Sequence, residues 1–515
     1  MDIASFKNYE VPFPMQADAY TASSDIFASN KAREKSVYNT TNRISPARTF
    51  PDIAKDSRMV FFGVQDYIRR NLTKPITHSE IVSSKLFMER ANSFGGALPF
   101  NQEMWYSVLY DYEGYLPIKI ESLPEGSVFF PNEPVIQVYG ANGFGELAAH
   151  IEGVMLGMWS NLTCRATITA HWKNSIRNIL IDEYGNDPSV VDGVIDWFIH
   201  DFGLRASSNA TESETMGRAH LLFFNGTDTF NAAYSAWRDS RYSSSPVGTS
   251  ILALAHRNIL GYENDVNDGE LECFKRLYEV SSDYGGIASY VSDCYNFKKA
   301  VDKLEWLIQQ NPDNANIVVS RPDSGDATDN IEYILNKNNK KLRFIEGNGV
   351  KPKQLLHTLA CLKNKDVFKR GIFGVGGYLR NSCNRDALSS KYALCSIGNE
   401  DRPVCKLSEE LGKVSIPGPT ILDRNDKVTS VKLKSESLPN DENKLELFYN
   451  GTNIHADRYM NGCLEDFDKI RDRANKEFFG MNDFSKANPN FGLTAGHLSS
   501  AIQNLRQDCM KKHKE

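Results

Sequence analysis

Charged and hydroxylated side chains follow a short apolar run in the segment Ile317–Asp326. The run ends in the sequence Arg-Pro-Asp-Ser-Gly, which places a cation, a carboxylate, a hydroxyl group and a glycine in succession. An apolar run rich in β-branched residues predicts a buried strand, and the apolar residues of Ile331–Leu335 predict a helix after it. A strand end with these side chains can bind a charged, hydroxylated ligand, although many such ends are polar only because they face solvent.

The same arrangement recurs through the middle of the chain. Further apolar runs occur at Trp197–Ile199, Leu221–Phe224, Ile251–Leu254, Ile287–Val291, Leu342–Ile345 and Gly371–Phe373. The polar residues that follow the runs lie about 25 to 37 residues apart, and segments with helical patterns fit between them. This alternation predicts parallel strands joined by crossover helices. The predicted fold class is therefore α/β with a (β/α) barrel-like domain, and an open doubly wound sheet is the alternative.

Parallel strands of either fold bring their carboxyl ends to one face, where ligands bind. The residues expected to meet there are His200, Asp201, Arg205, Asp228, His256, Asp293, Arg321, Asp323 and two glycine-rich stretches, Gly347–Gly349 and Gly374–Gly377. Carboxylates can hold Mg²⁺ or accept hydrogen bonds from ribose hydroxyls, and glycine-rich turns before helices suit phosphate. Arg205, Arg321 and Arg385 add cations. The set predicts a phosphorylated, hydroxylated ligand with a metal ion; the alternative for His256 alone is a satisfied core histidine.

Size and composition limit the class of protein. The 515 residues exceed one ordinary domain, and 41% hydrophobic with 24% charged residues is typical of a soluble globular protein. A net charge of −6 gives no basic surface for nucleic acid, and the sequence has no apolar run long enough to span a membrane. The nine cysteines are dispersed without metal-ligand spacing, which favours reduced thiols and a cytoplasmic location.

The segments outside the barrel region predict a second, mixed α+β domain. Residues Leu116–Tyr139 and Cys395–Lys434 contain short strand patterns broken by glycine and proline. We therefore expect residues 1–158 to form the N-terminal part of a mixed domain that also contributes to a dimer interface. Residues 159–395 would form the (β/α) barrel, and residues 396–515 would return to the mixed domain.

Several motifs in this order resemble those of the nicotinamide phosphoribosyltransferases, a family of type II phosphoribosyltransferases. The matching runs are Leu116–Val138, His200–Gly203, Gly226–Thr229, Val291–Asp293, Arg321–Gly325 and Phe373–Gly377. The resemblance implies that nicotinamide condenses with phosphoribosyl pyrophosphate (PRPP) to give nicotinamide mononucleotide and pyrophosphate, a step of NAD salvage. It also implies Mg²⁺, ATP as a possible co-substrate, and a homodimer with shared active sites.

The resemblance also implies roles for particular residues. Phe202 and Arg321 would sandwich the pyridine ring, and Asp228 would accept a hydrogen bond from the carboxamide. Asp293 and Asp323 would serve the Mg²⁺-pyrophosphate and ribose end, with His256 transiently phosphorylated by ATP. Further expected ligands of the base, ribose or phosphates are Arg205, Ser250, Gly347, Asn348, Gly376, Gly377 and Arg385, with Asp18, Tyr20 and Arg43 reaching in from the second subunit.

Five positions depart from the family pattern. Ala255 replaces a glutamate and Arg257 a small hydroxyl residue beside His256, which bears on the ATP coupling. Leu204 replaces a tyrosine, Asn348 an aspartate and Leu394 a phosphate-binding lysine. Two alternatives follow: a nicotinate phosphoribosyltransferase, against which the charge of Asp228 argues, and a catalytically weak homologue that acts as a binding or signalling protein.

Overall fold

The computed structural model describes residues 10–514 except 184, 244, 263–267, 338, 363–365, 408–413, 426–427 and 455–456. The chain divides into two compact units. The mixed unit comprises Met1–Pro51, Lys55–Thr167 and Cys383–Glu515, and the barrel unit comprises Asp52–Ala54 and Ile168–Ser382. The division lies within the long helix α8 (Glu152–Asn178). The domain limits at 158/159 and 395/396 stay predictions from the sequence.

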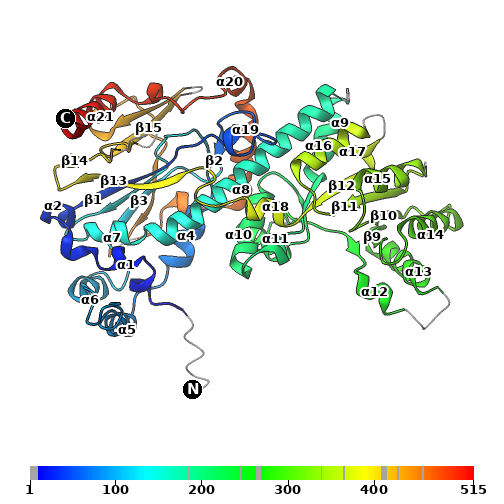
Figure 1. Ribbon diagram of the computed structural model, residues 1–515, viewed down its shortest axis with the longest axis horizontal. Helices are drawn as coiled ribbons and strands as arrows, with labels where there is room; N and C mark the ends of the chain where they lie inside the picture. The colour runs from blue at the N-terminus through cyan, green and yellow to red at the C-terminus, as the bar shows by residue number, and fades with distance from the viewer. Residues whose placement is uncertain are drawn as a thin grey trace. The chain divides into compact units, whose positions relative to one another are not determined.

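Seven parallel strands form the sheet of the barrel unit (Figure 1). In sheet order they are β7 (Gly226–Thr227), β6 (Ile199–Asp201), β12 (Gly371–Val375), β11 (Leu342–Glu346), β10 (Ile317–Arg321), β9 (Ile287–Val291) and β8 (Leu252–Ala253). A parallel bridge joins Gly226 to Thr249, shortly before β8, so the two edges of the sheet meet. The curled parallel sheet confirms the predicted α/β barrel-like class.

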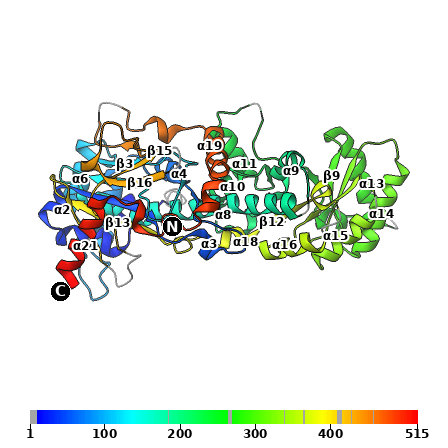
Figure 2. The same ribbon diagram turned by 90° about the horizontal axis from the view of Figure 1, so that it is seen from above.

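Helices pack around this sheet or follow the carboxyl ends of its strands. They are α9 (Pro188–Val194), α10 (Ala210–Leu221), α11 (Phe230–Asp239), α12 (His256–Leu260), α13 (Gly269–Ser281), α14 (Phe297–Gln310), α15 (Ala327–Asn336), α16 (Pro352–Cys361), α17 (Val367–Arg370) and α18 (Gly377–Asn381). Helices α13, α14 and α15 pack on β9, β10 and β11, and α13 is seen beside β9 in Figure 2. Helix α14, for example, buries Ala300, Val301, Leu304, Leu307 and Ile308. This apolar stripe at helical spacing is the face by which α14 packs on the sheet.

The prediction of a strand at Leu221–Phe224 is wrong. Helix α10 continues to Leu221, and the residues after it form a turn in which the amide groups of Phe223 and Phe224 donate to the carbonyl oxygen of His220. All four apolar residues are buried, but a buried run of four can belong to a helix end as well as to a strand. The strand itself is the short β7, which leads directly into Asp228.

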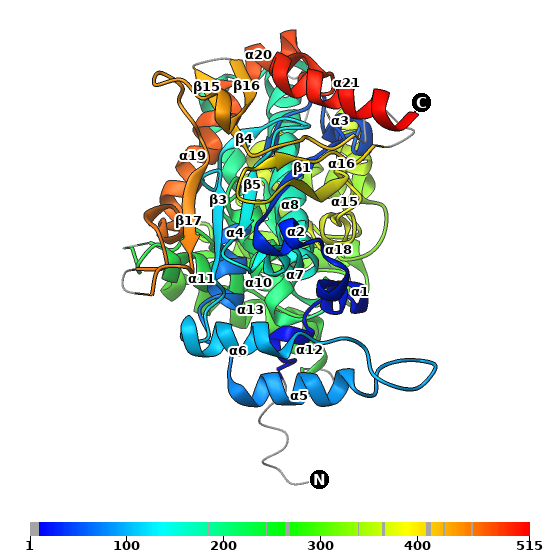
Figure 3. The same cartoon turned by 90° about the vertical axis from the view of Figure 1, so that its left-hand side faces the viewer.

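The mixed unit contains a six-stranded antiparallel sheet (Figure 3). Its order is β14 (Arg402–Pro403), β13 (Ser390–Ile397), β1 (Ser36–Asn42), β5 (Ile136–Gly140), β3 (Ile118–Ser122) and β17 (Glu446–Asn450). Two further pairs are β2 (Met59–Val60) with β4 (Val128–Phe129) and β15 (Thr420–Asn425) with β16 (Val428–Leu433). N-terminal, central and C-terminal segments thus share one sheet, as predicted for a mixed α+β domain.

The helices of the mixed unit are mostly short. They are α1 (Ala19–Ala22), α2 (Asn30–Glu34), α3 (Pro46–Thr49), α4 (Val64–Asn71), α5 (His78–Met88), α6 (Gln102–Asp111), α7 (Gly145–His150), α19 (Phe467–Gly480), α20 (Asn482–Ala487) and α21 (Ser500–Lys514). Helices α5 and α6 lie side by side (Figure 3). Within the part of the chain that the structure describes, none of the helices has the length and apolar character needed to cross a membrane.

Candidate active site

A cavity of about 1190 Å³ lies at the carboxyl ends of the barrel strands. Single-ligand pockets commonly measure about 300 to 1,000 Å³, so this space accommodates more than one small ligand. Its lining residues are Phe202, Leu204, Arg205, Ala206, Asp228, Thr229, Ala255, His256, Arg257, Arg321, Asp323, Gly347, Asn348, Gly349, Val350, Lys351, Gly376, Gly377, Tyr378, Asn381 and Ser382. Loops that follow most of the strands therefore contribute to one site.

Asp228 is an exposed carboxylate at the wall of this cavity. It follows β7, and its backbone amide donates to the carbonyl oxygen of Asp201 at 3.0 Å. The hydroxyl group of Ser250 donates to Asp228 Oδ1 at 2.5 Å. The backbone and the side chain of Asp228 are thus both held, and the carboxylate keeps acceptor capacity for a ligand because two oxygens offer about four lone pairs.

The ring of Phe202 packs against glycines at two other strand ends. A Cβ atom at Gly374 would lie 2.1 Å from the ring and one at Gly347 would lie 3.7 Å from it. Gly374 therefore has no room for a side chain, whereas Gly347 would make an ordinary contact. The sequence presents these glycines only as phosphate-binding candidates; Gly374 is also needed so that an aromatic face can line the cavity.

His256, Asp293 and Ser324 form a hydrogen-bonded chain across three strand ends. His256 Nε2 lies 3.0 Å from Asp293 Oδ1, and the Ser324 hydroxyl donates to Asp293 Oδ2 at 2.6 Å. The histidine side chain is 44% exposed and the aspartate side chain only 8%. With its proton on Nε2, facing the carboxylate, the imidazole carries its lone pair on Nδ1. The pairing gives His256 the geometry of an oriented nucleophile rather than that of a buried core histidine.

Arg321 and Asp323 lie together at the end of β10. The guanidinium donates to the carbonyl oxygen of Leu254 at 2.8 Å, and its Nε lies 3.7 Å from Asp323 Oδ1. Among the described residues, no three histidine, cysteine or acidic side chains come together as a protein-only metal site would require. Mg²⁺ is commonly held by one or two carboxylates together with substrate phosphates, and the pair Asp293 and Asp323 fits that kind of site.

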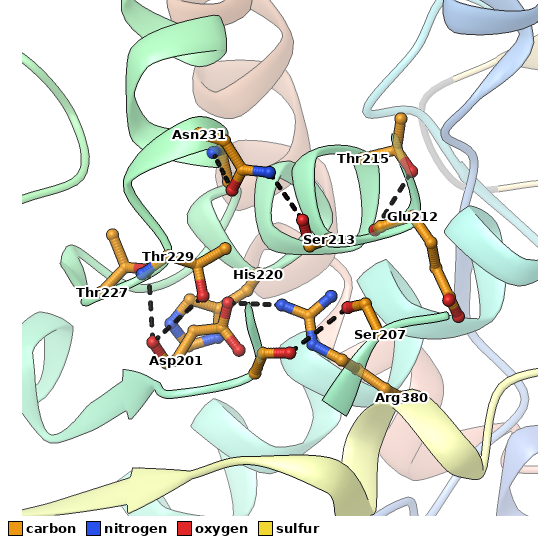
Figure 4. Close-up of polar contacts among 12 residues, drawn as sticks. Asp201, Ser207, Glu212, Ser213, Thr215, His220, Thr227, Thr229, Asn231 and Arg380 are labelled. Atoms are coloured by element: carbon orange, nitrogen blue, oxygen red, sulfur yellow. Dashed lines mark hydrogen bonds and ion pairs between the residues drawn. The ribbon is translucent and has the colours of Figure 1, made fainter. Parts of the chain in front are cut away.

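Asp201 does not belong to the cavity, which corrects its expected place among the ligand-binding carboxylates. Its Oδ2 accepts a hydrogen bond from Arg380 at 2.7 Å, and both side chains are fully buried (Figure 4). A Cβ atom at Gly203 would lie 1.9 Å from Arg380 Nε, so this glycine makes room for the guanidinium. The pair joins the end of β6 to the helix that follows the Gly376-Gly377 turn. It supports the cavity wall, and neither side chain is among the residues that line the cavity.

His200 is also displaced from its expected place. It lines a separate cavity of about 280 Å³ in the barrel unit together with Thr249, Ser250 and Arg343. Burial lowers the pKa of His200 to about 4, so the imidazole is neutral near pH 7. Of the other barrel residues predicted as ligands, Arg205, Gly347, Asn348, Gly376 and Gly377 all line the large cavity.

Arg43 and Arg385 lie in the mixed unit, in a pocket of about 240 Å³ that contains four cationic side chains. The other two, Lys391 and Lys406, were not predicted from the sequence. Burial lowers the pKa of Lys391, the charge of Glu152 raises it, and the charges of Lys406, Arg43 and Arg385 lower it further. Gathered like charges favour binding of an anion. Leu394, where the resemblance leads one to expect a lysine, lies on β13 with Lys391, so this strand still supplies a cation.

Asp18 and Tyr20 also lie in the mixed unit. The Tyr20 hydroxyl donates to Asp18 Oδ2 at 2.9 Å, and the side chain of Tyr20 is 71% exposed. This hydrogen bond and the negative charge of Asp18 raise the pKa of the tyrosine. Both residues line a pocket of about 210 Å³ that also includes Glu152 and Arg385. An exposed aromatic ring beside a polar pocket is available for contact with a ligand or a second subunit.

Known proteins share this sequence and this fold. The sequence profile described as the "Nicotinate phosphoribosyltransferase (NAPRTase) family" matches residues 197–428. A protein named nicotinamide phosphoribosyltransferase from Xanthomonas campestris pv. campestris (strain 8004) is 30% identical over 359 residues, covering 65% of this chain and 72% of that protein. One of the same name from Acinetobacter baylyi (strain ATCC 33305 / BD413 / ADP1) is 31% identical over 289 residues, covering 53% of this chain and 54% of that protein.

Two crystal structures resemble the fold of the chain. The structure of human nicotinic acid phosphoribosyltransferase covers 96% of this chain and 99% of its own, with a TM-score of 0.63 and 14% identity. Nicotinate-nucleotide pyrophosphorylase from Pyrococcus furiosus covers 92% and 97%, with a TM-score of 0.59 and 14% identity. Together with the sequence matches, the barrel and its cavity define a phosphoribosyltransferase, which is an enzyme. The chain belongs to the nicotinate phosphoribosyltransferase (NAPRTase) family.

Proposed function

We propose that the protein is a nicotinamide phosphoribosyltransferase, which makes nicotinamide mononucleotide and pyrophosphate from nicotinamide and PRPP. The names of the bacterial relatives support this proposal. The observation that carries it is the Asp228 carboxylate, held by Ser250 at the cavity wall. It can accept a hydrogen bond from the carboxamide of nicotinamide, whereas the carboxylate of nicotinate would meet repulsion between like charges. Production of nicotinamide mononucleotide in NAD salvage would follow.

The chemistry needs positioning more than proton transfer. The pyridine nitrogen of nicotinamide carries a free lone pair, so it can attack the anomeric carbon of PRPP without a general base. The bond from that carbon to the pyrophosphate oxygen breaks as the new carbon–nitrogen bond forms. Phe202 and Arg321, which both line the cavity, would hold the pyridine ring by stacking and cation–π attraction. The enzyme then accelerates the reaction by orientation and by stabilising the positive charge that develops on the ribose.

The acidic strand ends would bind the pyrophosphate end of PRPP. Asp293 and Asp323 are the residues that would hold a Mg²⁺ ion there. When bound, Mg²⁺ neutralises charge on the leaving pyrophosphate. The negative charge of the two carboxylates favours the positive charge that develops at the anomeric carbon. Asn348 and Gly347 would bind ribose hydroxyls, and Gly376, Gly377 and Arg205 would bind the 5′-phosphate.

We also propose that the chain acts as a homodimer with shared active sites. The cationic pocket around Arg43, Arg385, Lys391 and Lys406 suits a phosphate or pyrophosphate group. Tyr20 is exposed and close to Asp18, so both can reach a second subunit. In this arrangement the mixed unit of one subunit would supply anion ligands and an aromatic ring to the barrel cavity of the other.

His256 would couple the reaction to ATP. Nδ1 of the imidazole would attack the γ-phosphorus of ATP, ADP would leave, and water would later hydrolyse the phosphohistidine. Asp293, 3.0 Å from Nε2, would stabilise the positive charge that the ring acquires. Arg257 lines the cavity beside His256 and would add a positive charge near the transferred phosphoryl group. In the family pattern the neighbouring position 255 carries a glutamate, and here it is Ala255, so the surroundings of His256 are more positive than in that pattern.

A single assay separates this proposal from its alternatives. Product formation from PRPP is compared with nicotinamide and with nicotinate, in the presence of Mg²⁺ and with or without ATP. Preference for nicotinate would favour the acid-specific enzyme. Absence of pyrophosphate release with either base would favour a homologue that has become a binding protein. A cytoplasmic location remains part of the proposal.

A further inference from the structure

Glu346 is a fully buried carboxyl group directly beneath the cavity wall. It is the last residue of β11, and its exposed fraction is 0%. The next three residues, Gly347, Asn348 and Gly349, all line the cavity. Arg343, Phe344 and Ile345, the residues of β11 that directly precede Glu346, line the smaller cavity of the barrel, whereas Glu346 does not. Neither the resemblance nor the mechanism above gives Glu346 a role.

The contacts of Glu346 link two strand ends. Its Oε1 accepts a hydrogen bond from the backbone amide of Asn348 at 2.8 Å. The side-chain amide of Asn348 in turn donates to the carbonyl oxygen of Gly325 at 3.0 Å. Gly325 belongs to the loop after β10, which carries Asp323 and Ser324. The buried carboxyl group therefore fixes the Asn348 turn, and that turn fixes the loop that bears an acid of the proposed pyrophosphate site.

The buried position makes the ionised form of the Glu346 carboxyl group unfavourable. Among the described residues, the other oxygen of Glu346, Oε2, has no hydrogen-bond partner. Burial raises the pKa of Glu346 to about 7, the Asn348 amide lowers it, and the charges of Asp323, Asp326 and Asp293 raise it. An apolar residue would fill this place without that penalty, so a buried acid here indicates that its hydrogen bond to the turn has a use.

We propose that Glu346 is a positioning residue for the ribose and pyrophosphate end of PRPP. It holds the Asn348 turn, and through it the Gly325 loop, in the conformation that binds the substrate. This inference rests on the proposed function for its substrate. The tie, by which we mean the two hydrogen bonds that link Glu346 to Asn348 and Asn348 to Gly325, is a property of the free protein. The nicotinamide end is formed by Phe202 and Asp228 at other strand ends. The Phe202 ring makes only an ordinary contact with Gly347, so the tie should affect this end less than the ribose and pyrophosphate end.

Two variants separate the tie from the charge. Glu346→Ala removes the acceptor for the Asn348 amide, whereas Glu346→Gln keeps an acceptor oxygen of the same size without the negative charge. Glu270→Ala is the matched control, because Glu270 is 4% exposed and also has one oxygen without a partner among the described residues, but it pairs with Lys303 on α14. Steady-state kinetics give KM for each substrate, and hydrogen–deuterium exchange of residues 347–349 is measured without substrate.

Glu346→Ala is expected to raise KM for PRPP about tenfold, which corresponds to the loss of one hydrogen bond to a charged group. KM for nicotinamide and kcat should change less than about twofold, and exchange at 347–349 should accelerate. In Glu346→Gln, KM for PRPP and the exchange at 347–349 should both be close to the wild-type values. Glu270→Ala should change neither quantity. Unchanged exchange in Glu346→Ala, or a KM effect equal for both substrates, overturns the inference. If the wild-type protein shows no turnover, the proposed function is wrong. The hydrogen–deuterium exchange experiment then still decides whether the tie exists.

Discussion

Ser250 and Asp228 come from different strand ends, and the hydroxyl of the serine donates to the carboxylate of the aspartate at 2.5 Å. The serine precedes β8 and the aspartate follows β7, at the place where the two edges of the barrel sheet meet. The hydrogen bond fixes one carboxylate oxygen and leaves the other for a ligand. The closure of the barrel thus sets the direction in which the acid faces the cavity.

The variant Asp228→Asn tests what this acid selects. The amide side chain removes the negative charge and can donate to a carboxylate, so the repulsion of nicotinate disappears. We expect kcat/KM for nicotinamide to fall about tenfold and that for nicotinate to rise by a similar factor, the usual effect of one such contact. Asp313→Asn, an exposed acid in the turn before β10, is the control. If the ratio of the two bases stays as in the wild type, Asp228 does not select the base.

The buried ion pair of Asp201 and Arg380 predicts a large stability effect. Replacement of Arg380 by Met leaves an uncompensated carboxylate at a position with 0% exposure, and the free energy of unfolding should fall by about 3 to 5 kcal/mol. The double variant Asp201→Asn with Arg380→Met should recover much of that loss because no charge is left buried. Urea denaturation measures both. A double variant as unstable as the single one would show that packing, not charge, dominates.

The stability of the protein should depend on pH through Glu346. Its pKa in the folded state, about 7, lies above the value near 4.5 expected for the unfolded chain, so the folded state binds more protons between these values. The free energy of unfolding of the wild type should therefore fall as pH rises through this window, by about 3 kcal/mol relative to Glu346→Gln. Denaturation at several pH values gives the two slopes. Parallel slopes would mean that Glu346 keeps an ordinary pKa.

Replacement of His256 by Ala should abolish the coupling to ATP. Without an imidazole no phosphohistidine can form, so ADP release during turnover and the stimulation by ATP should both be lost while some ATP-independent transfer remains. ADP and nicotinamide mononucleotide are quantified in the same reaction. His357→Ala, an exposed histidine on α16, is the control. ADP formation that persists in the His256 variant would rule out the phosphohistidine.

A mixed dimer tests whether subunits share their sites. Asp323→Ala disables the barrel cavity and Arg385→Ala disables the cationic pocket of the mixed unit, so each homodimer should be inactive. In a heterodimer of the two variants, isolated with two affinity tags, one composite site keeps both intact parts and about half of the wild-type activity should return. A heterodimer as inactive as its parents would indicate that each subunit uses its own pocket.

The sequence predicts most strand ends of the barrel because they follow from a repeated local pattern. Each apolar run with a polar residue after it marks a strand end, and parallel strands must bring those ends together. Asp228, His256 and Asp323 follow from this pattern and line the cavity, and Asp293, which also follows from it, contacts His256. Asp201 fits the same pattern, yet Arg380 buries it, and a pairing across 179 positions of the chain leaves no local signal. Pattern reasoning locates strand ends but does not tell which acid faces the ligand.

Other features depend on contacts that no short stretch of sequence contains. Lys391 joins Arg43 in one pocket because β13 pairs with β1 in the sheet of the mixed unit, and Lys406 reaches the same pocket from beyond β14. The role of Glu346 depends on its burial, and glutamate at a strand end is ordinarily exposed. The segment Leu221–Phe224, expected to be a strand, is a helix end and a turn. A buried helix end and a buried strand are equally apolar, so a short apolar run does not distinguish them.

The assay that tests the central claim most directly measures nicotinamide mononucleotide and nicotinate mononucleotide formed by the wild-type protein. Purified protein is supplied with PRPP, Mg²⁺ and equal concentrations of both bases, with Asp323→Ala as the inactive control. The account predicts that nicotinamide mononucleotide is the dominant product and that the variant releases no pyrophosphate. Dominant nicotinate mononucleotide, or equal pyrophosphate release by the variant, would contradict it.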